Sequence, residues 1–337
     1  MSRKSILEIS DLNVSFISDK KSIPAVDGIS FDLKEGEILG IVGESGSGKS
    51  VTSLAVMGLI PSPPSKIANG KILFEGNDLT SYSDKQMRQI RGNQISMIFQ
   101  EPMTSLNPLF TIGNQLIEAL RLHTKISKAE ARNRSVDLLK LVGIPRAEGI
   151  IGEYPHQLSG GMRQRVMIAM AMACNPRILI ADEPTTALDV TIQAQILNLM
   201  KDLNHKTNTS IILITHDLGV VAEVCDRVLV MYCGQIVEHG DVRTILKEPK
   251  HPYTKGLLKS VPDLRGKKGR LYSIPGNVPK PGSIEQGCRF APRCEEMFGK
   301  CTEETPDLYE MEKHGHQVRC FLHKVDKGAG EHVGVTS

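Results

Sequence analysis

Gly43-Glu44-Ser45-Gly46-Ser47-Gly48-Lys49-Ser50 matches the pattern G-x-x-x-x-G-K-[ST]. A short apolar stretch, residues 37–42, precedes this loop, and a helix-compatible stretch, residues 49–59, follows it. In such a strand–loop–helix unit, glycines let backbone N–H groups surround phosphate oxygens, the lysine reaches the β- and γ-phosphates, and the last hydroxyl ligates Mg²⁺. The positive end of the following helix favours the same anion. The segment predicts a nucleotide site in an α/β fold.

A second segment, Ile178-Leu179-Ile180-Ala181-Asp182-Glu183, reads as an apolar strand that ends in two acids. A carboxylate at the end of such a strand coordinates Mg²⁺ in nucleotide hydrolases, which makes Asp182 the predicted metal ligand. Glu183 is the better candidate for polarising the attacking water. His216 directly follows another apolar strand, residues 211–215, and Gln100 follows the predicted strand 95–99. Both are therefore predicted beside the γ-phosphate.

A third segment, Leu158-Ser159-Gly160-Gly161-Met162, opens a predicted helix rich in Met and Ala. A serine hydroxyl and glycine N–H groups at a helix start form an anion site. The chain's own phosphates are already held by residues 43–50, so a second anion site indicates the nucleotide of another subunit. The alternative is a simple helix cap. Because the sequence has no internal repeat, the second copy of the fold must come from a separate chain.

The composition is that of a folded protein without a large charge excess. Of the 337 residues, 40% are hydrophobic and 23% charged, and 41 basic against 38 acidic residues give a net charge of +3. This balance argues against a nucleic-acid partner. The longest apolar run, Val166–Cys174, falls short of the roughly 18 residues that span a bilayer. With no secretory signal at residues 1–5, we expect a cytosolic chain that reaches a membrane only through a partner.

The order of elements predicts the domain organisation. Mixed β structure with one helix fills the first hundred residues, residues 103–142 have helical periodicity, and strands then alternate with helices, which indicates a parallel sheet covered on both faces. We expect one domain over residues 1–250, with a helical part inserted at about 101–160. A second domain over residues 251–337 would consist of a linker, 262–287, and a cysteine cluster, 288–320.

Taken in this order, the segments resemble those of ATP-binding cassette (ABC) ATPases over about Leu7–Lys250. The resemblance implies a P-loop (RecA-like) α/β core with an antiparallel β subdomain and an inserted helical subdomain. Residues 43–50 correspond to the Walker A loop, Leu158–Met162 to the signature, Ile178–Asp182 to the Walker B strand and Ala187–Asp189 to the D-loop. The signature departs from the family in one respect, because Met162 stands where glutamine is usual.

The resemblance also assigns roles to single residues. The implied catalytic residues are Glu183, His216, Lys49 and Gln100. The implied Mg²⁺ ligands are Ser50, Gln100 and Asp182. The residues implied to bind ATP in this chain are Phe16, which would stack on adenine, and Gly43, Glu44, Ser45, Gly46, Ser47, Gly48, Lys49, Ser50 and Val51. The residues implied to contact the partner's ATP are Leu158, Ser159, Gly160, Gly161 and Met162, with Asp189 in the D-loop.

Three further segments, Gln100–Pro108, His251–Lys255 and Cys288–Cys294, are similar to those of dipeptide/oligopeptide (and nickel) importer ATPases. This resemblance implies one of two ATPase subunits, in a heterodimer or homodimer, on the cytoplasmic face of the inner membrane. Two permeases and a solute-binding protein would be its partners. Peptide is the implied cargo, with nickel, oligosaccharide or another small solute as alternatives. A DNA-repair ATPase would carry long coiled-coil insertions, and residues 51–157 show no sustained heptads.

Four cysteines, Cys288, Cys294, Cys301 and Cys320, cluster with the spacing C-x5-C-x6-C-x18-C. Structural zinc sites usually contain a pair separated by two to four residues, and this cluster has none. Four irregularly spaced thiolates can hold an iron–sulfur cluster, and the resemblance implies [4Fe-4S] at these positions. Zinc, with His314, His316 and His323 nearby, and metal-free thiols remain alternatives, as does a redox-sensing role.

Overall fold

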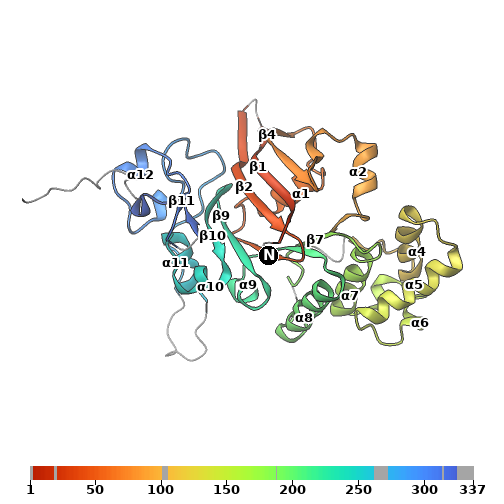
Figure 1. Ribbon diagram of the computed structural model, residues 1–337. Coiled ribbons are helices and arrows are strands. Elements are labelled where there is room, and N and C mark those ends of the chain that lie inside the picture. The colour runs from red at the N-terminus through yellow and green to blue at the C-terminus, as the bar shows by residue number, and fades with distance from the viewer. Residues whose placement is uncertain are drawn as a thin grey trace, which may run out of the picture.

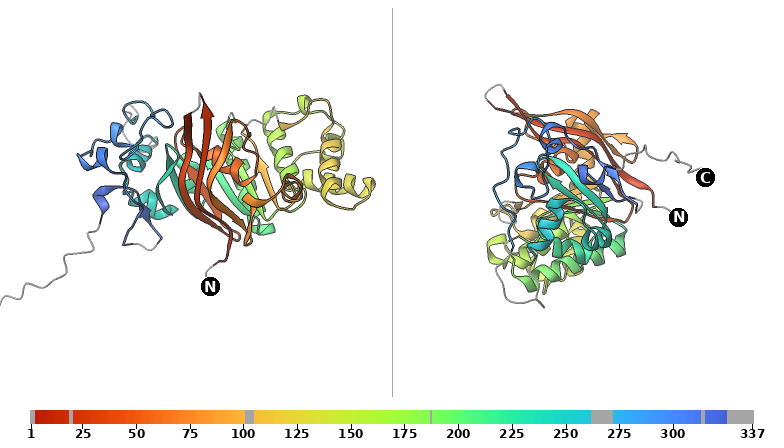
Figure 2. Two further views of the ribbon diagram at one scale, coloured as in Figure 1. Left: turned by 90° about the horizontal axis from the view of Figure 1, so that it is seen from above. Right: turned by 90° about the vertical axis from the view of Figure 1, so that its left-hand side faces the viewer.

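The structure is a computed structural model that describes residues 3–18, 21–100, 105–186, 188–261, 272–312 and 315–324. Figures 1 and 2 show two β-sheets in the middle of the molecule. A group of helices, α4 to α7, lies at one side, and the last elements of the chain, α11 to β11, lie at the opposite side. The sheets therefore separate the helical part from the cysteine-containing segment.

The larger sheet has the strand order β11-β12-β10-β9-β3-β8-β7-β6 in the described chain. Its parallel strands are β3 (Ile38–Val42), β6 (Ile95–Ile98), β7 (Ile178–Asp182), β8 (Ser210–Thr215) and β9 (Arg227–Tyr232). Every residue of β3, β7 and β8 is buried, as the continuous apolar runs require in a sheet covered on both faces. The parallel pairing brings the carboxyl ends of β3, β6, β7 and β8 to one edge.

The smaller sheet is antiparallel, with the order β2-β1-β4-β5. It comprises β1 (Ser5–Ser18), β2 (Lys21–Lys34), β4 (Ser65–Phe74) and β5 (Asn77–Asp78). Helix α1 (Lys49–Val56) packs in the core shared by the two sheets, where Ala55 and Val56 join Ile41 and Ile180. The helix following the glycine loop is therefore held by both sheets. The short η1 (Leu79–Ser81) and α2 (Asp84–Ile90) follow this sheet.

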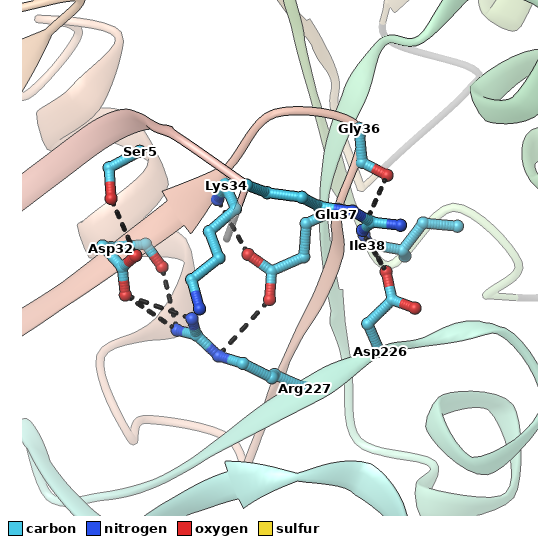
Figure 3. A network of polar contacts seen from close by, with 9 residues as sticks. Ser5, Asp32, Lys34, Gly36, Glu37, Ile38, Asp226 and Arg227 are labelled. Carbon is cyan, nitrogen blue, oxygen red and sulfur yellow. Dashed lines mark hydrogen bonds and ion pairs between the residues drawn. The ribbon is translucent and has the colours of Figure 1, made fainter. Parts of the chain in front are cut away.

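A partly buried ion network joins β9 of the large sheet to the small sheet (Figure 3). The Arg227 guanidinium donates to Asp32 Oδ1 at 3.0 Å and lies 3.3 Å from Glu37 Oε1. The Glu37 side chain is only 3% exposed, and it also accepts the Lys34 N–H at 2.7 Å. Burial raises the pKa of Glu37, and the Arg227 charge opposes that rise. One arginine thus neutralises a carboxylate of β2 and one in the turn between β2 and β3.

Helices cover the opposite face of the large sheet. The insertion between β6 and β7 supplies α4 (Ile112–His123), α5 (Lys128–Leu141), α6 (Ala147–Ile150), η2 (Pro155–Gln157) and α7 (Gly160–Ala171). Later in the chain come α8 (Val190–Thr207), α9 (Leu218–Val224), β10 (Gln235–Asp241) and α10 (Val242–Lys247). One continuous apolar cluster runs from Leu116 and Leu139 in the insertion to Ile196 and Val221 under the sheet. The insertion is therefore packed onto the core.

The end of the chain adds strands to the large sheet. Its elements are α11 (Pro252–Lys259), η3 (Ala291–Arg293), α12 (Lys300–Glu303), β11 (Tyr309–Glu310), β12 (Gln317–Val318) and η4 (Phe321–His323). Strand β12 pairs antiparallel with β10, and His316 Nε2 lies 2.9 Å from the fully buried Glu238 of β10. We call residues 272–324 the C-terminal segment. The division into domains at residue 250 stays a prediction.

The structure agrees with the predicted α/β class and refines the element bounds. The helix compatible with residues 49–59 ends at Val56. Strand β10 and helices α9 to α11 were not predicted. Of the predicted linker, residues 262–271 lie outside the described residues, and 272–287 contain no helix or strand. Among the described residues, no helix is long and apolar enough to cross a membrane.

Candidate nucleotide-binding site

The glycine loop joins β3 to α1 at the carboxyl edge of the large sheet. Gly48, the residue before α1, has φ of +101°, and a Cβ there would stand 2.7 Å from the Ala25 carbonyl oxygen. A Cβ on Gly43 would come within 2.2 Å of the Met231 carbonyl oxygen. Neither position accepts a side chain without displacing backbone. The tight fit explains why the loop needs glycine at its two ends.

Lys49 lies inside the loop and is 6% exposed. Its ammonium donates to the Gly43 carbonyl at 2.8 Å and to the Glu44 carbonyl at 3.1 Å. Burial lowers the pKa of Lys49, while the charges of Glu183 and Asp182 oppose that shift. The cation is therefore placed between the loop carbonyls and the acids at the end of β7, as a phosphate ligand requires.

Asp182 ends β7 and is 4% exposed. Burial raises the pKa of this carboxyl, although the Ser50 hydroxyl hydrogen-bonds to it. Its Oδ1 atom is buried and has no hydrogen-bond partner among the described residues. A buried carboxylate oxygen without a donor, next to a serine hydroxyl, is the donor set that a hard cation such as Mg²⁺ takes. The residues present therefore fit the predicted metal.

Three side chains converge on Glu183. Its carboxylate accepts from Thr186 Oγ1 at 2.8 Å and from Gln100 Nε2 at 3.1 Å, and His216 Nδ1 lies 3.6 Å from Oε1. Burial alone would raise the pKa of Glu183, but Thr186, His216 and Gln100 together hold it below its usual value. An ionised carboxylate can accept a proton from water. The sequence predicted Gln100 and His216 here and missed Thr186, whose only signal is a hydroxyl three residues after the acid.

The segment 158–162 lies at the start of α7, where Ser159 Oγ accepts the Met162 N–H at 3.3 Å. A Cβ on Gly160 would meet nothing closer than 3.8 Å, whereas one on Gly161 would come within 2.9 Å of Ile192. Gly160 therefore offers open backbone, while Gly161 allows α7 to pack on α8. In the described chain, no hydrogen bond or ion pair joins this segment to residues 43–50.

The remaining predicted residues lie on elements around these groups. Phe16 is half-buried in β1 opposite Ile23, and Val51 is half-buried in the first turn of α1. Asp189 caps α8 by accepting the Ile192 N–H at 3.0 Å. The structure does not by itself assign a nucleotide contact to these three residues, so their roles stay predictions.

An apolar cleft of about 360 Å³ lies between the sheet core and the helical insertion. Its walls include Met57, Met97, Phe99, Leu106 and Met167. Phe99 is 41% exposed and immediately precedes Gln100. An occupant of this cleft would therefore lie one residue from a side chain that contacts Glu183.

The four clustered cysteines border a second, small cavity, together with His251 and Phe290. All four are free thiols, and burial raises the pKa of Cys288, Cys294 and Cys320. As placed, no group of three or more His, Cys, Asp or Glu residues in the described chain forms a metal site. His314 lies outside the described residues, and His316 is engaged with Glu238. All four thiols therefore border the same cavity.

Comparisons with known proteins agree with this arrangement. Residues 26–186 match the family model described as ABC transporter, and residues 237–301 match the one described as oligopeptide/dipeptide transporter, C-terminal region. The oligopeptide transport ATP-binding protein AppD of Bacillus subtilis is 57% identical over 96% of this chain and 98% of its own length. The chain belongs to the ABC ATPases of the oligopeptide/dipeptide transporter family. The dipeptide transport ATP-binding protein DppD of Escherichia coli, 50% identical over 96% of this chain and 98% of its own, is another relative.

Solved structures support the same family. This ABC ATPase superimposes on the cassette MJ0796, in a dimeric post-hydrolysis state with ADP and Pi, with a TM-score of 0.64 and 29% identity. The match covers 70% of this chain and 99% of that one. CbiO1 from Clostridium perfringens gives a TM-score of 0.62 at 30% identity, over 72% of this chain and 91% of its own. This family member is therefore an ATPase with the cassette fold.

Proposed function

We propose that this ABC ATPase is the ATP-hydrolysing motor subunit of an importer for dipeptides and oligopeptides. The observation that carries the proposal is the convergence of Gln100, Thr186 and His216 on the Glu183 carboxylate, beside the buried Lys49. In this set Glu183 is an ionised base, Lys49 is a cation for the γ-phosphate, and Gln100 is a side chain that can sense that phosphate. The oligopeptide/dipeptide family match and the peptide-transport relatives support the cargo.

The chemistry follows from the placement of these groups. Backbone N–H groups of residues 43–50 would hold the phosphates, and Ser50, Asp182 and Gln100 would hold Mg²⁺, which neutralises charge on the β- and γ-phosphates. Glu183 orients a water in line with the γ-phosphorus and takes its proton. Lys49 and His216 stabilise the negative charge that develops on the transferred oxygens. Phe16 would stack on the adenine ring.

A complete site requires two cassettes. ATP bound at residues 43–50 of one chain would be covered by Leu158, Ser159, Gly160, Gly161 and Met162 of the other. The open backbone at Gly160 and the hydroxyl of Ser159 suit a phosphate that arrives from outside the chain. Asp189 would lie at the same interface. The second cassette is a different ATPase subunit or a second copy of this one.

The cleft beside Phe99 suits a helix from a membrane permease. Its lining is mainly apolar, and an amphipathic helix buries its apolar face in such grooves. Pressure on the cleft would reach Glu183 through Gln100. Two permeases would bring the ATPase to the cytoplasmic face of the inner membrane as a peripheral subunit, and a solute-binding protein would deliver the peptide.

We also propose that Cys288, Cys294, Cys301 and Cys320 form a C-terminal domain that ligates a [4Fe-4S] cluster. Four thiols bordering one cavity are the donor set of such a cluster. Zinc is the competing occupant. Metal analysis of anaerobically purified protein tests this: four irons per chain and a brown colour support the cluster. A colourless, zinc-bearing or metal-free preparation overturns it.

Reconstitution of the complete importer in vesicles tests the function. The wild type should take up a labelled dipeptide in an ATP-dependent manner. Glu183→Gln should bind ATP normally but lose most hydrolysis and uptake, by about 10²-fold or more, because the group that takes the proton is gone. Glu223→Gln, an exposed glutamate of α9, is the matched control and should behave as the wild type. Uptake of nickel or an oligosaccharide without dipeptide uptake would overturn the cargo.

A further inference from the structure

The C-terminal segment reaches back to the nucleotide loop through Arg293. The guanidinium makes a two-pronged contact with Glu44, with Nη1 to Oε2 at 2.7 Å and Nη2 to Oε1 at 3.1 Å. Glu44 is the second residue of the loop that is proposed to hold phosphates. The Arg293 side chain is only 4% exposed, against 30% for Glu44. A buried fork of this kind is the strong, oriented form of the carboxylate–arginine contact.

Arg293 is itself held in place by further groups. Its Nε donates to the Pro275 carbonyl at 3.0 Å and Nη2 to the Ile274 carbonyl at 3.3 Å. Nη1 also lies 3.3 Å from the Tyr232 hydroxyl. These contacts come from the C-terminal segment and from the end of β9. The guanidinium is therefore preorganised, and Glu44 meets a cation whose position is already fixed.

The backbone of Glu44 is held from the same side. Its N–H donates to the hydroxyl of Tyr253 at 2.9 Å, and Tyr253 is fully buried. The ring of Tyr253 packs on Tyr232 at 4.7 Å between centroids, and Tyr232 packs edge-on against Phe290 at 5.2 Å. Side chain and main chain of Glu44 are thus both fixed by residues that pack with the C-terminal segment.

Glu44 connects this contact to the catalytic lysine. The Glu44 carbonyl accepts from Lys49 Nζ at 3.1 Å, so a shift of Glu44 would move a ligand of that ammonium. The Glu44 carboxylate also carries a negative charge in a loop that must bind a more strongly charged anion. Unless a cation neutralises it, this charge opposes phosphate binding. Arg293 supplies that cation, so it affects both the geometry and the charge of the loop.

We propose that Arg293 is a positioning residue for ATP binding: the C-terminal segment holds and neutralises Glu44 and thereby keeps the loop competent for phosphate. The proposal rests on the proposed function, in which residues 43–50 bind ATP. Arg293 directly precedes Cys294, and Phe290 borders the same cavity as the four thiols. A structural change at those thiols would therefore shift η3, the short helix that ends at Arg293, before it reached residues 43–50.

The test is a double-mutant cycle on the full-length protein, with a fluorescent ATP analogue and Mg²⁺ as the probe. Arg293→Met keeps the apolar stem, removes the charge and leaves Glu44 unpaired, and should raise the Kd about tenfold. Glu44→Gln in the Arg293→Met background removes the unpaired charge and should bring the Kd back to within about threefold of the wild type. Arg293→Lys, which keeps charge but not the fork, should fall in between.

Lys300→Met is the matched control, because it removes a partly exposed cation of the same segment that pairs with Glu304 and lies over the Phe321 ring, away from Glu44. Its Kd should equal that of the wild type. The proposal is overturned if Arg293→Met lowers the melting temperature but leaves the Kd unchanged, or if the two substitutions add without coupling. If the wild type and Lys49→Ala bind the analogue equally, the ATP site itself is misassigned, which is a different failure.

Discussion

Arg227→Met should destabilise the protein strongly and in a pH-dependent way (Figure 3). The substitution leaves Glu37 without its cation at a position where the side chain is 3% exposed. Removing one partner of a buried ion pair costs about 3–5 kcal/mol. Asp32, at 34% exposure, adds little, because pairs near water contribute about 1 kcal/mol or less. Methionine keeps the packing of the arginine stem, so we expect the free energy of unfolding at pH 7 to fall by about 3–4 kcal/mol.

The pH dependence follows from the pKa shifts of the two carboxyls. Burial raises the pKa of Glu37 and Arg227 counteracts it, so the substitution raises this pKa further. The free-energy cost of burying ionised Glu37 in the variant then disappears as the pH falls through the pKa of Glu37 in the folded variant. For Asp32, burial is outweighed by Arg227, so its pKa is lowered and its stabilising contribution is lost as pH falls below the usual value of about 4. Wild type and variant should therefore converge toward low pH.

Urea denaturation followed by circular dichroism at pH 7 and pH 5 measures this effect. The difference in unfolding free energy should be smaller at pH 5 than at pH 7. Arg88→Met is the control, since its ion pair with Asp84 is about two-thirds exposed on both sides and should contribute little to stability. A difference below about 1 kcal/mol, or one equal at both pH values, would refute the buried-pair reasoning.

Two further predictions concern the ATPase of the assembled complex. Thr186→Ala should lower kcat about three- to tenfold with an unchanged KM for ATP, because it removes one hydrogen bond to Glu183. Thr186→Ser keeps the hydroxyl and should retain activity. A change in KM without a change in kcat would contradict this prediction. Ser159→Arg should reduce hydrolysis by more than about tenfold while ATP binding to the separate chain stays unchanged; normal hydrolysis in the complex would rule out a shared site.

The sequence predicted the parts of the site that depend on local pattern. The sequence pattern indicates the glycines by their fixed spacing. It indicates Asp182, Glu183 and His216 because each follows an apolar strand, and parallel strands end at a common edge. The sheet then brings Gln100 and His216 to Glu183, and their place beside the γ-phosphate stays a prediction. Thr186 was missed because a single hydroxyl has no periodic signal. Its role depends on the turn in which Glu183 adopts φ of +47°.

The contacts that no local pattern predicted are those between distant segments. Arg227 lies 195 residues from Asp32, and Arg293 lies 249 residues from Glu44. Strand β10 was missed for a related reason, because its polar residues Glu238 and His239 interrupt the apolar run. Both pair with β12, and Glu238 also contacts His316 and accepts the backbone N–H groups of Lys250 and His251. Tertiary pairing outweighed local propensity at this edge of the sheet.

The charge on Glu44 explains why the nucleotide loop and the C-terminal segment belong together. The ammonium of Lys49 is the cation of the loop for phosphate, so it cannot also neutralise Glu44 once ATP is bound. The cation that pairs with this carboxylate comes from Arg293 at the end of η3. Nearby, Arg289 donates to the Cys233 carbonyl and pairs with Asp27, and the Gly234 N–H donates to Ser47 at 2.9 Å. We infer that Glu44 depends on the C-terminal segment for the cation that neutralises it. Removing that segment should therefore weaken ATP binding, although the signature and Glu183 are left unchanged.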